Sequence, residues 1–491
     1  MRPRRHISIG LCICGALALT FAAPTVFAQA PPAATPAPAK AASQADVRER
    51  IERLEKLLAE TRAELAALKA AAAVSADARL AEIERRLEIL AREIEALRLG
   101  EAGGAEPARP ETPAPAATPA RPLGLGLSAS KVYGVKRGVS IGGYGEALYE
   151  GFAAEDQAGR PASEPDRVTL LRAVVYLGYK FDDRFVLNTE VEYENAVVAS
   201  DKKGEAEVEF AYVDYTRSRA VNARAGLVLI PMGLVNELHE PVSFLGARRP
   251  DVEQVIIPTT WREIGFGLYG VAGPLSYRAY LVNGLNAAGF TAGEGFREGS
   301  GEGSEALAEN WAFTGRLDYV GIDGLLVGAS VFAGDAGQGQ RTPAGRRIGA
   351  LTTIFDVHAD WRWRGAWLRG LYARTSVSQA ALVNELNGFE GADSIGSRQE
   401  GWYLQAAYDV LSGNASSRLS LLPYVRYEAF DTQAEVPTGY ARNPANDVRQ
   451  WTLGLAFQPI EALILKADWQ RRHNAASTGV NRWNVALGWI F

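Results

Sequence analysis

The sequence predicts an all-β transmembrane antiparallel barrel of about 16 strands, preceded by an α-helical coiled coil. Two observations predict the barrel. Apolar and polar residues alternate in many segments between residue 130 and the C-terminus, and short links alternate with long links between these segments. A third observation, an apolar heptad pattern over 47–97, predicts the coiled coil. We therefore expect the coiled coil over 45–99 and the barrel over 130–491.

The first 28 residues have the features of a signal peptide. Three arginines among the first five residues precede an apolar stretch over 7–22, and Val26-Phe27-Ala28 offers a cleavage site after Ala28. Both cysteines of the chain lie in this segment, so we expect a mature chain without disulfides, as suits an exported protein that needs no such crosslink. The formal net charge of −5 shows no basic excess that would indicate nucleic-acid binding.

An Ala/Pro-rich spacer over 29–44 leads into the helical zone, where apolar residues step by four and three positions in turn. The first run consists of Val47, Ile51, Leu54, Leu58, Leu65 and Leu68, with the polar Thr61 at one step, and the second of Leu80, Ile83, Leu87, Leu90, Ile94 and Leu97. A monomeric helical hairpin that folds back over 70–77 is the alternative, and the number of helices in the coiled coil stays open. A Pro/Ala-rich linker follows over 100–129.

The alternation in the predicted barrel separates two faces. In "FDVHADWRWR" (355–364), Phe, Val, Ala and Trp share one face, and Asp, His and Arg share the other. The C-terminal "NRWNVALGWIF" (481–491) alternates Trp, Val, Leu, Trp and Phe with polar or small residues. A soluble β-sandwich can carry a charged face too, but about sixteen such segments, with aromatics close to their ends, are typical of an outer-membrane barrel.

The lengths of the links give an independent indication. Counted from Gly138, links after even-numbered segments are short, as at 182–183 and 322–323, whereas most links after odd-numbered segments are long, as at 231–260 and 286–308. Outer-membrane barrels have short periplasmic turns and longer external loops. An even number of strands places both ends of the barrel in the periplasm, and the coiled coil with them.

Two stretches carry a resemblance to a known family. They are "GLVLIPMGLVNELHEPVSFLGARRPDVEQVIIPTTWREIGFGLYG" (226–270) and the terminal "WNVALGWIF" (483–491). Over 132–491 the chain resembles the porins, and in particular the phosphate-selective porin O/P family. Members of that family follow an apolar strand with a Pro-containing loop, then a Trp and a Gly-rich strand, as Pro231, Trp261, Gly265, Gly267 and Gly270 do here.

The resemblance implies an outer-membrane protein of a Gram-negative bacterium, a homotrimer with one water-filled pore per subunit for passive diffusion of small hydrophilic solutes or ions. It implies that the third external loop, 231–260, folds into the lumen, and that Phe491 belongs to the signal for insertion into the outer membrane. Family members select phosphate with lumenal Arg and a cluster of Lys at the constriction. The resemblance therefore also implies small anionic or neutral solutes, with phosphate among them.

Candidate pore residues lie on the third loop and on the inward face of the strands. On the loop we expect Arg248, Arg249, Asp251 and Glu253 at the constriction, where opposed charges would bias ions. The basic residues that the alternation places toward the lumen are Arg172, Arg224, Arg278, Arg316, Arg362, Arg426, Lys466 and Arg482. Acidic residues share this inward face, so the lumen is mixed in charge. Salt bridges from loop to wall, and ion-pair networks along the wall, are the alternative roles.

Enzyme motifs are absent from the sequence, which contains no G-x-S-x-G elbow, Walker motif, CxxC pair or EF-hand loop. We therefore expect no catalysis, cofactor or metal. His358, beside Asp356 and Asp360 at strand spacing, is a candidate for a weak metal or acid–base site, although an ordinary polar cluster is the commoner outcome.

The alternative function is structural. The heptad zone over 47–97 would reach about 75 Å as one continuous helix, at about 1.5 Å per residue. A helix of that length would tether the outer membrane to the cell wall, with peptidoglycan as the partner. No recognisable wall-binding module precedes it in the sequence.

Overall fold

The computed structural model describes residue 56 and the ranges 125–199, 204–413 and 419–491. All of these except Lys56 belong to the second of two compact units, Pro113–Phe491. The predicted signal peptide and spacer, the coiled coil apart from Lys56, and the linker up to residue 124 lie outside the described residues. Within the described ranges, no helix is long and apolar enough to cross a membrane.

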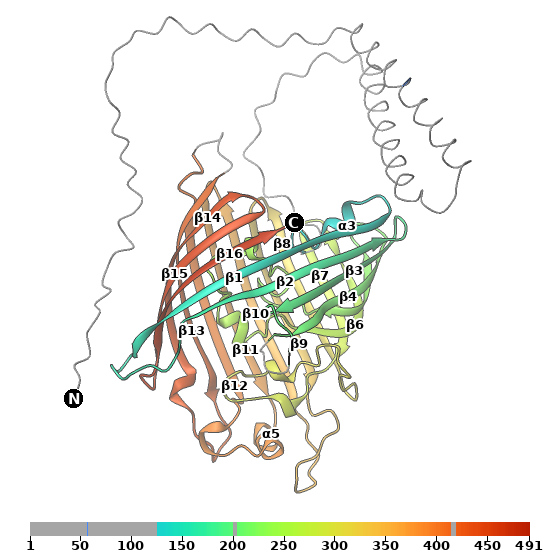
Figure 1. Cartoon of the computed structure of the whole chain (residues 1–491). Coiled ribbons are helices and arrows are strands. Elements are labelled where there is room, and N and C mark those ends of the chain that lie inside the picture. Colours follow the sequence, from blue (N-terminus) through green and yellow to red (C-terminus); the bar gives the residue numbers. More distant parts are fainter. Residues whose placement is uncertain (1–55, 57–124, 200–203, 414–418) are drawn as a thin grey trace, which may run out of the picture. The chain divides into compact units, whose positions relative to one another are not determined.

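Sixteen antiparallel strands of the described residues close into a barrel, which confirms the barrel part of the predicted fold class (Figure 1). The strands are β1 (Gly138–Asp156), β2 (Arg167–Lys180), β3 (Phe185–Glu194), β4 (Ala206–Thr216), β5 (Asn222–Leu229), β6 (Arg262–Ala272), β7 (Leu275–Asn283), β8 (Trp311–Ile322), β9 (Leu325–Asp335), β10 (Leu351–Trp363), β11 (Ala366–Val377), β12 (Arg398–Tyr408), β13 (Ser420–Glu435), β14 (Asp447–Ile460), β15 (Leu463–Asn474) and β16 (Val480–Ile490). The short helices are α3 (Lys131–Gly134), η2 (Pro241–Ser243), α4 (Val252–Val255), η3 (Ala287–Gly289), η4 (Arg297–Gly299), α5 (Ala380–Asn387), η5 (Gly391–Asp393) and η6 (Pro444–Asn446).

The pairing of β1 with β16 closes the barrel. Tyr144 pairs with Ile490 and Gly151 with Trp483, and the backbone N–H of Phe491 donates to the Gly143 carbonyl at 2.9 Å. Closure removes the two edge strands, whose backbone N–H and C=O groups would otherwise lack partners. The C-terminal alternation is therefore the strand that closes the barrel.

Side chains of the strands alternate between an apolar outer face and an inner face. In β16, Trp483 is 63% exposed and Val485 is 50% exposed, whereas Asn484 and Ala486 between and beside them are buried. The strand β10 shows the same alternation, with aromatic and aliphatic residues outside and Thr352, Ile354, Asp356 and His358 buried inside. The outer face therefore has the composition that lipid contact requires.

The two ends of the barrel differ in the length of their connections. Short turns, at one end, are 181–184, 217–221, 273–274, 323–324, 364–365 and 461–462. Long loops, at the other end, are 157–166, 230–261, 284–310, 336–350, 378–397 and 436–446. Figure 1 shows α3 and the C-terminus near the short-turn end and α5 at the long-loop end. This pattern agrees with the lengths of the links in the sequence.

The lumen contains a hydrophobic core in addition to charged side chains. Loops supply its buried residues Ile230, Met232, Leu234, Val252, Ile256, Ile257, Trp261, Phe290, Phe296, Ile348, Val383 and Ile395, and the walls supply Tyr176, Phe210, Tyr212, Phe332, Ile354 and Tyr403. The sequence predicted a mixed, charged lumen and the resemblance a water-filled one. The core arises because the long loops turn inward and bury their apolar side chains, which a strand-by-strand alternation does not show.

The segment just before β1 also packs inside the barrel. Leu125 and Ala129, in the last five residues of the predicted linker, are 2% and 5% exposed. The Ser128 hydroxyl donates to the carbonyl of Phe491, and the Asn188 side-chain amide donates to the Ala129 carbonyl at 2.9 Å. This end of the linker is therefore fixed to both the closing strand and β3.

Candidate functional site

Residues 230–261, which we call the lumen loop, leave β5 and cross the interior of the barrel before β6. The Ala247 N–H donates to Asp468 Oδ2 on β15 at 2.7 Å, and the Val252 N–H donates to Glu428 Oε1 on β13 at 3.3 Å. The Arg316 guanidinium on β8 donates to the Gly233 carbonyl. The lumen loop thus reaches strands far from its own ends. It is the third connection at the long-loop end, after those that follow β1 and β3, and it folds into the lumen as the resemblance implies.

Two polar side chains organise the lumen loop from within. Glu253 accepts hydrogen bonds from the backbone N–H groups of Leu234 at 2.6 Å and Val235 at 2.8 Å, and from the Tyr403 hydroxyl at 2.6 Å. Asn236 closes the neck of the loop, because its amide nitrogen donates to the Trp261 carbonyl and its oxygen accepts from the Trp261 N–H. Glu253 is fully buried. Its carboxylate therefore satisfies backbone groups that would otherwise be unpaired in the interior.

The four residues expected at the constriction lie in different surroundings. Arg248 Nη1 contacts Glu150 Oε1 on β1 at 3.0 Å, and Asp251 contacts Arg472 Nη1 on β15 at 2.6 Å. Glu253 faces its own loop, as described above. Arg249 is 7% exposed, and its Nε and Nη2 atoms have no hydrogen-bond partner. Arg248 and Asp251 thus form the loop-to-wall salt bridges that the sequence left as an alternative, rather than facing each other across a gap.

Asp251 sits among three guanidinium groups. Burial by itself would raise the pKa of this carboxyl, but Arg472, Arg482 and Arg248 outweigh burial and lower the pKa to about 2. Asp251 is therefore ionised at neutral pH and holds the lumen loop to β15 and β16.

The basic residues predicted to face the lumen are all on the inner face, and most are paired there. Their carboxylate partners are Glu146 and Glu192 for Arg172, Asp214 for Arg224, Glu237 and Asp318 for both Arg278 and Arg316, Asp360 for Arg362, Glu428 for Arg426, and Glu150 and Asp251 for Arg482. Lys466 differs, since its ammonium lies 3.7 Å from the centre of the Phe244 ring. The wall therefore carries ion-pair networks, the other alternative that the sequence left open.

A cavity of about 220 Å³ lies between the lumen loop and strands β1, β2 and β3. Four arginines line it, namely Arg172, Arg248, Arg249 and Arg297, together with the two acidic residues Glu146 and Glu194. The remaining lining residues are Leu171, Phe244, Ala247, Gln254, Thr259 and Thr260. The excess of guanidinium groups makes this cavity attractive to anions.

The sequence did not identify two groups that belong to these networks. Arg297 reaches the cavity from η4, within a Gly-rich stretch that reads as an ordinary external loop. Glu237, on the lumen loop, contacts Arg278 Nε at 2.9 Å and is 7% exposed. The one available signal was the polar run "NELHE" (236–240) within an otherwise apolar part of the loop.

His358 joins two aspartates, one of them unexpected. Its Nδ1 lies 2.6 Å from Asp356 Oδ1, and its Nε2 lies 2.9 Å from Asp318 Oδ1 on β8. Asp360, the other expected neighbour, pairs with Arg369 instead. The Asp318 carboxylate also pairs with Arg316. His358 is thus part of a polar cluster in the lumen.

The role of Glu253 inside the lumen loop gives a first prediction. Glu253→Gln should speed amide hydrogen exchange in 230–240, because an NH₂ group would then face the N–H and O–H donors that the carboxylate now satisfies. The expected loss is about 1–3 kcal/mol, the usual cost of leaving a buried donor unpaired. Exchange measured by mass spectrometry on the folded protein in detergent tests this. Glu302→Gln, at an exposed contact with Arg262, is the matched control, and equal exchange in both variants would contradict the assigned role.

No family model matches the chain. Solved structures with a similar arrangement include an anion-selective porin from Comamonas acidovorans, with 13% identity, 72% of this chain and 99% of that chain covered, and a TM-score of 0.45. Another is Salmonella typhi OmpF in complex with daunomycin, with 12% identity, coverage of 72% and 98%, and a TM-score of 0.47. A third is the outer membrane channel DcaP of Acinetobacter baumannii, with 12% identity, coverage of 75% and 100%, and a TM-score of 0.44.

A curated relative matches more closely in sequence. It is an uncharacterised protein of Aquifex aeolicus (strain VF5), 38% identical over 377 residues, which cover 75% of this chain and 83% of the relative. At this identity and coverage, the chain belongs to the family of that Aquifex aeolicus protein.

Proposed function

We propose that the chain is an outer-membrane porin, a channel for passive diffusion of small hydrophilic solutes or ions. The observation that carries the proposal is the closed barrel of sixteen strands, apolar outside and lined inside by charged side chains. A closed barrel with this alternation suits a bilayer, because every strand is paired and every second residue meets lipid. The short-turn end would then face the periplasm. Following the resemblance, the assembly would be a homotrimer.

The route of a solute would pass beside the lumen loop. The core of buried loop residues fills much of the interior, whereas the cavity of about 220 Å³ borders β1, β2 and β3. A solute on this route would meet Arg248 and Arg249 from the loop and Arg172 from the wall. Asp251 and Glu253 would hold the loop in place, and their charges are taken up by that task.

The same arginines would give the channel a preference for anions, phosphate among them. Arg249 has two guanidinium nitrogens without a hydrogen-bond partner, and the contacts of Arg172 with Glu146 and Glu192 are long, at 3.6 and 3.8 Å. Both side chains line the cavity and keep hydrogen-bonding capacity that an anion bound there would use. A guanidinium stays charged at every physiological pH and presents a planar fork that matches phosphate and carboxylate oxygens.

The second prediction concerns conduction itself. Folded protein should run as a trimer in a mass measurement in detergent and give stepwise conductance in planar bilayers, with small steps because loops occupy much of each lumen. Heat-denatured protein in the same detergent is the control. Folded trimers that stay silent over repeated insertions would rule out the channel.

The third prediction concerns selectivity. In a KCl gradient, the double variant Arg248→Glu and Arg249→Glu should move the reversal potential toward cation selectivity, because four units of charge change beside the route. The same exchange at Arg341 and Arg347, both on the exposed surface of the loop 336–350, is the matched control and should leave the potential nearly unchanged. Phosphate added in competition should reduce the chloride current of the original chain more than that of the variant. A potential that moves equally in both double variants would remove these arginines from the filter.

A second candidate function is a mechanical link between the outer membrane and the cell wall. The hydrogen bonds that hold residues 125–134 inside the barrel favour this function. The Tyr133 hydroxyl donates to Asp214 Oδ2 at 2.6 Å, and the N–H groups of Ser128 and Ala129 donate to Glu240 Oε1 at 2.9 and 3.0 Å. A force on the linker that precedes residue 125 would therefore act on buried contacts of the barrel. Peptidoglycan would be the partner bound by the N-terminal part of the chain.

The fourth prediction tests this link with the barrel left intact. Full-length protein should co-sediment with purified peptidoglycan, and a chain that lacks residues 45–99 should stay in the supernatant. The deletion leaves every described contact of residues 125–134 in place. The barrel of the shortened chain should therefore fold as in the full-length protein. Equal sedimentation of the two chains would contradict a tether through the coiled coil without affecting the channel.

A further inference from the structure

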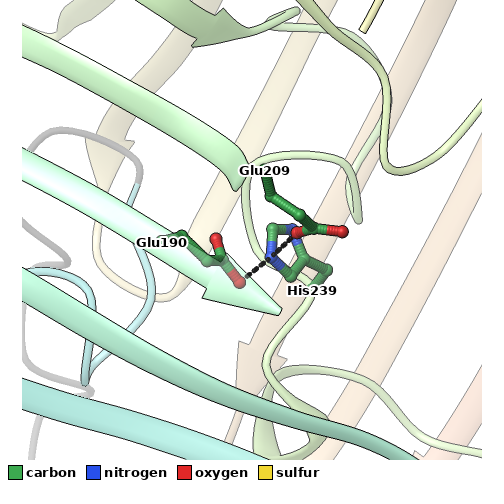
Figure 2. Close-up of side chains that lie close together, drawn as sticks. All are labelled: Glu190, Glu209 and His239. Atoms are coloured by element: carbon green, nitrogen blue, oxygen red, sulfur yellow. Dashed lines mark hydrogen bonds and ion pairs between the residues drawn. The ribbon is translucent and has the colours of Figure 1, made fainter. Parts of the chain in front are cut away.

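A histidine and two glutamates, none of which lines the arginine-rich cavity, converge inside the barrel. His239 lies on the lumen loop, Glu190 on β3 and Glu209 on β4 (Figure 2). His239 Nε2 is 3.2 Å from Glu190 Oε1 and 3.2 Å from Glu209 Oε2. All three residues are 3% exposed or less. Figure 2 shows both carboxylates turned toward the imidazole ring.

A β-bulge brings Glu209 into this position. Between β3 and β4, Glu190 pairs with Phe210, but the next residue, Val191, pairs with Val208, so Glu209 is the extra residue. As a result, both Glu209 and its neighbour Phe210 are buried on the inner side, against the usual alternation of a strand. Bulges of this kind re-aim a side chain and are common next to functional sites.

The hydrogen bond on the other ring nitrogen fixes the orientation of His239. Its Nδ1 lies 2.8 Å from the carbonyl oxygen of Asn236, which can only accept, so Nδ1 carries a hydrogen. Nε2 therefore points its lone pair, or its hydrogen when the ring is protonated, toward the two carboxylates. Histidines that bind metals are held in the same manner, with the distal ring nitrogen donating to a backbone carbonyl.

The spacing of the three atoms matches a shared metal. Ligand atoms bound to one tetrahedral centre at about 2.0–2.2 Å lie about 3.3–3.6 Å apart. The two distances of 3.2 Å from Nε2 are close to this value, and the three ligand atoms all lie within 4.8 Å of one another.

One carboxylate oxygen of this group has no partner of its own. Glu190 Oε2 makes no hydrogen bond although Glu190 is 0% exposed, whereas Oε2 of Glu209, which is 1% exposed, has the contact with His239 Nε2. Two buried carboxylates at this distance repel each other, and each charge is costly to bury without compensation. A cation between them would supply that compensation.

We propose that Glu190, Glu209 and His239 bind one divalent transition-metal ion, best represented by Zn²⁺. One imidazole and two carboxylates suit Zn²⁺, and three protein ligands leave a fourth position for a solvent molecule. The bound ion would join the lumen loop to β3 and β4 at the point where the bulge occurs. The site would thus fix the loop beside the proposed pore, and it stands independently of the proposed channel function.

A proton is the alternative occupant. Burial by itself would lower the pKa of His239, but the neighbouring carboxylates of Glu190 and Glu209 raise it to about 10. The imidazolium would then bridge the two carboxylates without a metal. The two occupants differ in a measurable way, since only one of them brings zinc with the folded protein.

The fifth prediction is the zinc content of the full-length protein. Folded protein in detergent, stripped with a chelator and dialysed against Zn²⁺, should hold one tightly bound zinc per chain by elemental analysis and should gain thermal stability. Co²⁺ in place of Zn²⁺ should give absorption bands of a low-symmetry site. In His239→Gln and Glu209→Gln the affinity for Zn²⁺ should fall more than about tenfold, since even the loss of an outer partner costs about 10–100-fold.

The variants distinguish the loss of the zinc site from misfolding of the barrel. Heat-dependent mobility on a gel verifies that Glu209→Gln still folds into the barrel, so a loss of zinc in that variant reports the loss of a ligand. His473→Gln, at a histidine whose ring contacts Arg471, is the matched control and should keep its zinc. No zinc in the folded original chain, or the same amount in the original and in both ligand variants, would overturn the proposal and leave the proton as the occupant.

Discussion

The pairing of β1 with β16 is the constraint on which the rest of the structure depends. Backbone groups without partners cost several kcal/mol each in a hydrocarbon environment, so a sheet that meets lipid must close. Closure sends every second side chain of sixteen strands into one enclosed space. That space receives many arginines, glutamates and aspartates. Each of these charges then needs a partner, because a buried and unpaired charge is far more costly than a buried apolar group.

The lumen loop supplies many of those partners. Glu237 serves Arg278 and Arg316, and backbone carbonyls of the loop accept from arginines on β8, β11 and β13. The loop in turn depends on the wall, since the N–H of Ala247 is satisfied by a carboxylate of β15. The loop and the inner wall therefore stabilise each other. Several groups that keep free hydrogen-bonding capacity lie on the side of β1 to β4, at the cavity and around His239.

Local periodicity explains how much of this the sequence could predict. Alternation and link length are properties of short segments, so the fold class, the sixteen strands, the outward Trp483 and the inward Arg426 follow from them. Other features depend on contacts between distant segments, which no repeating sequence pattern reveals. They are the hydrophobic core formed by the loops, the position of Arg297 at the cavity and the position of Glu253 inside its own loop. The bulge at Glu209 is a further case, because one extra residue shifts the face of its neighbours without a signal in the sequence.

The two groups of charges beside the lumen loop also bear on each other. Arg172 and Arg249 line the cavity, and Arg172 contacts Glu192, the inward neighbour of Glu190 on β3. The negative charge of Glu190 and Glu209 therefore acts close to the cavity and weakens its attraction for anions. An occupant that neutralises those two carboxylates removes their repulsion of anions in the cavity. Charges act strongly on each other in a low-dielectric interior, so the effect reaches the cavity. A divalent ion neutralises both charges, whereas a single proton neutralises one. The occupant of the buried site would thus set how strongly the arginines act on a passing anion, even though no solute would touch the site itself.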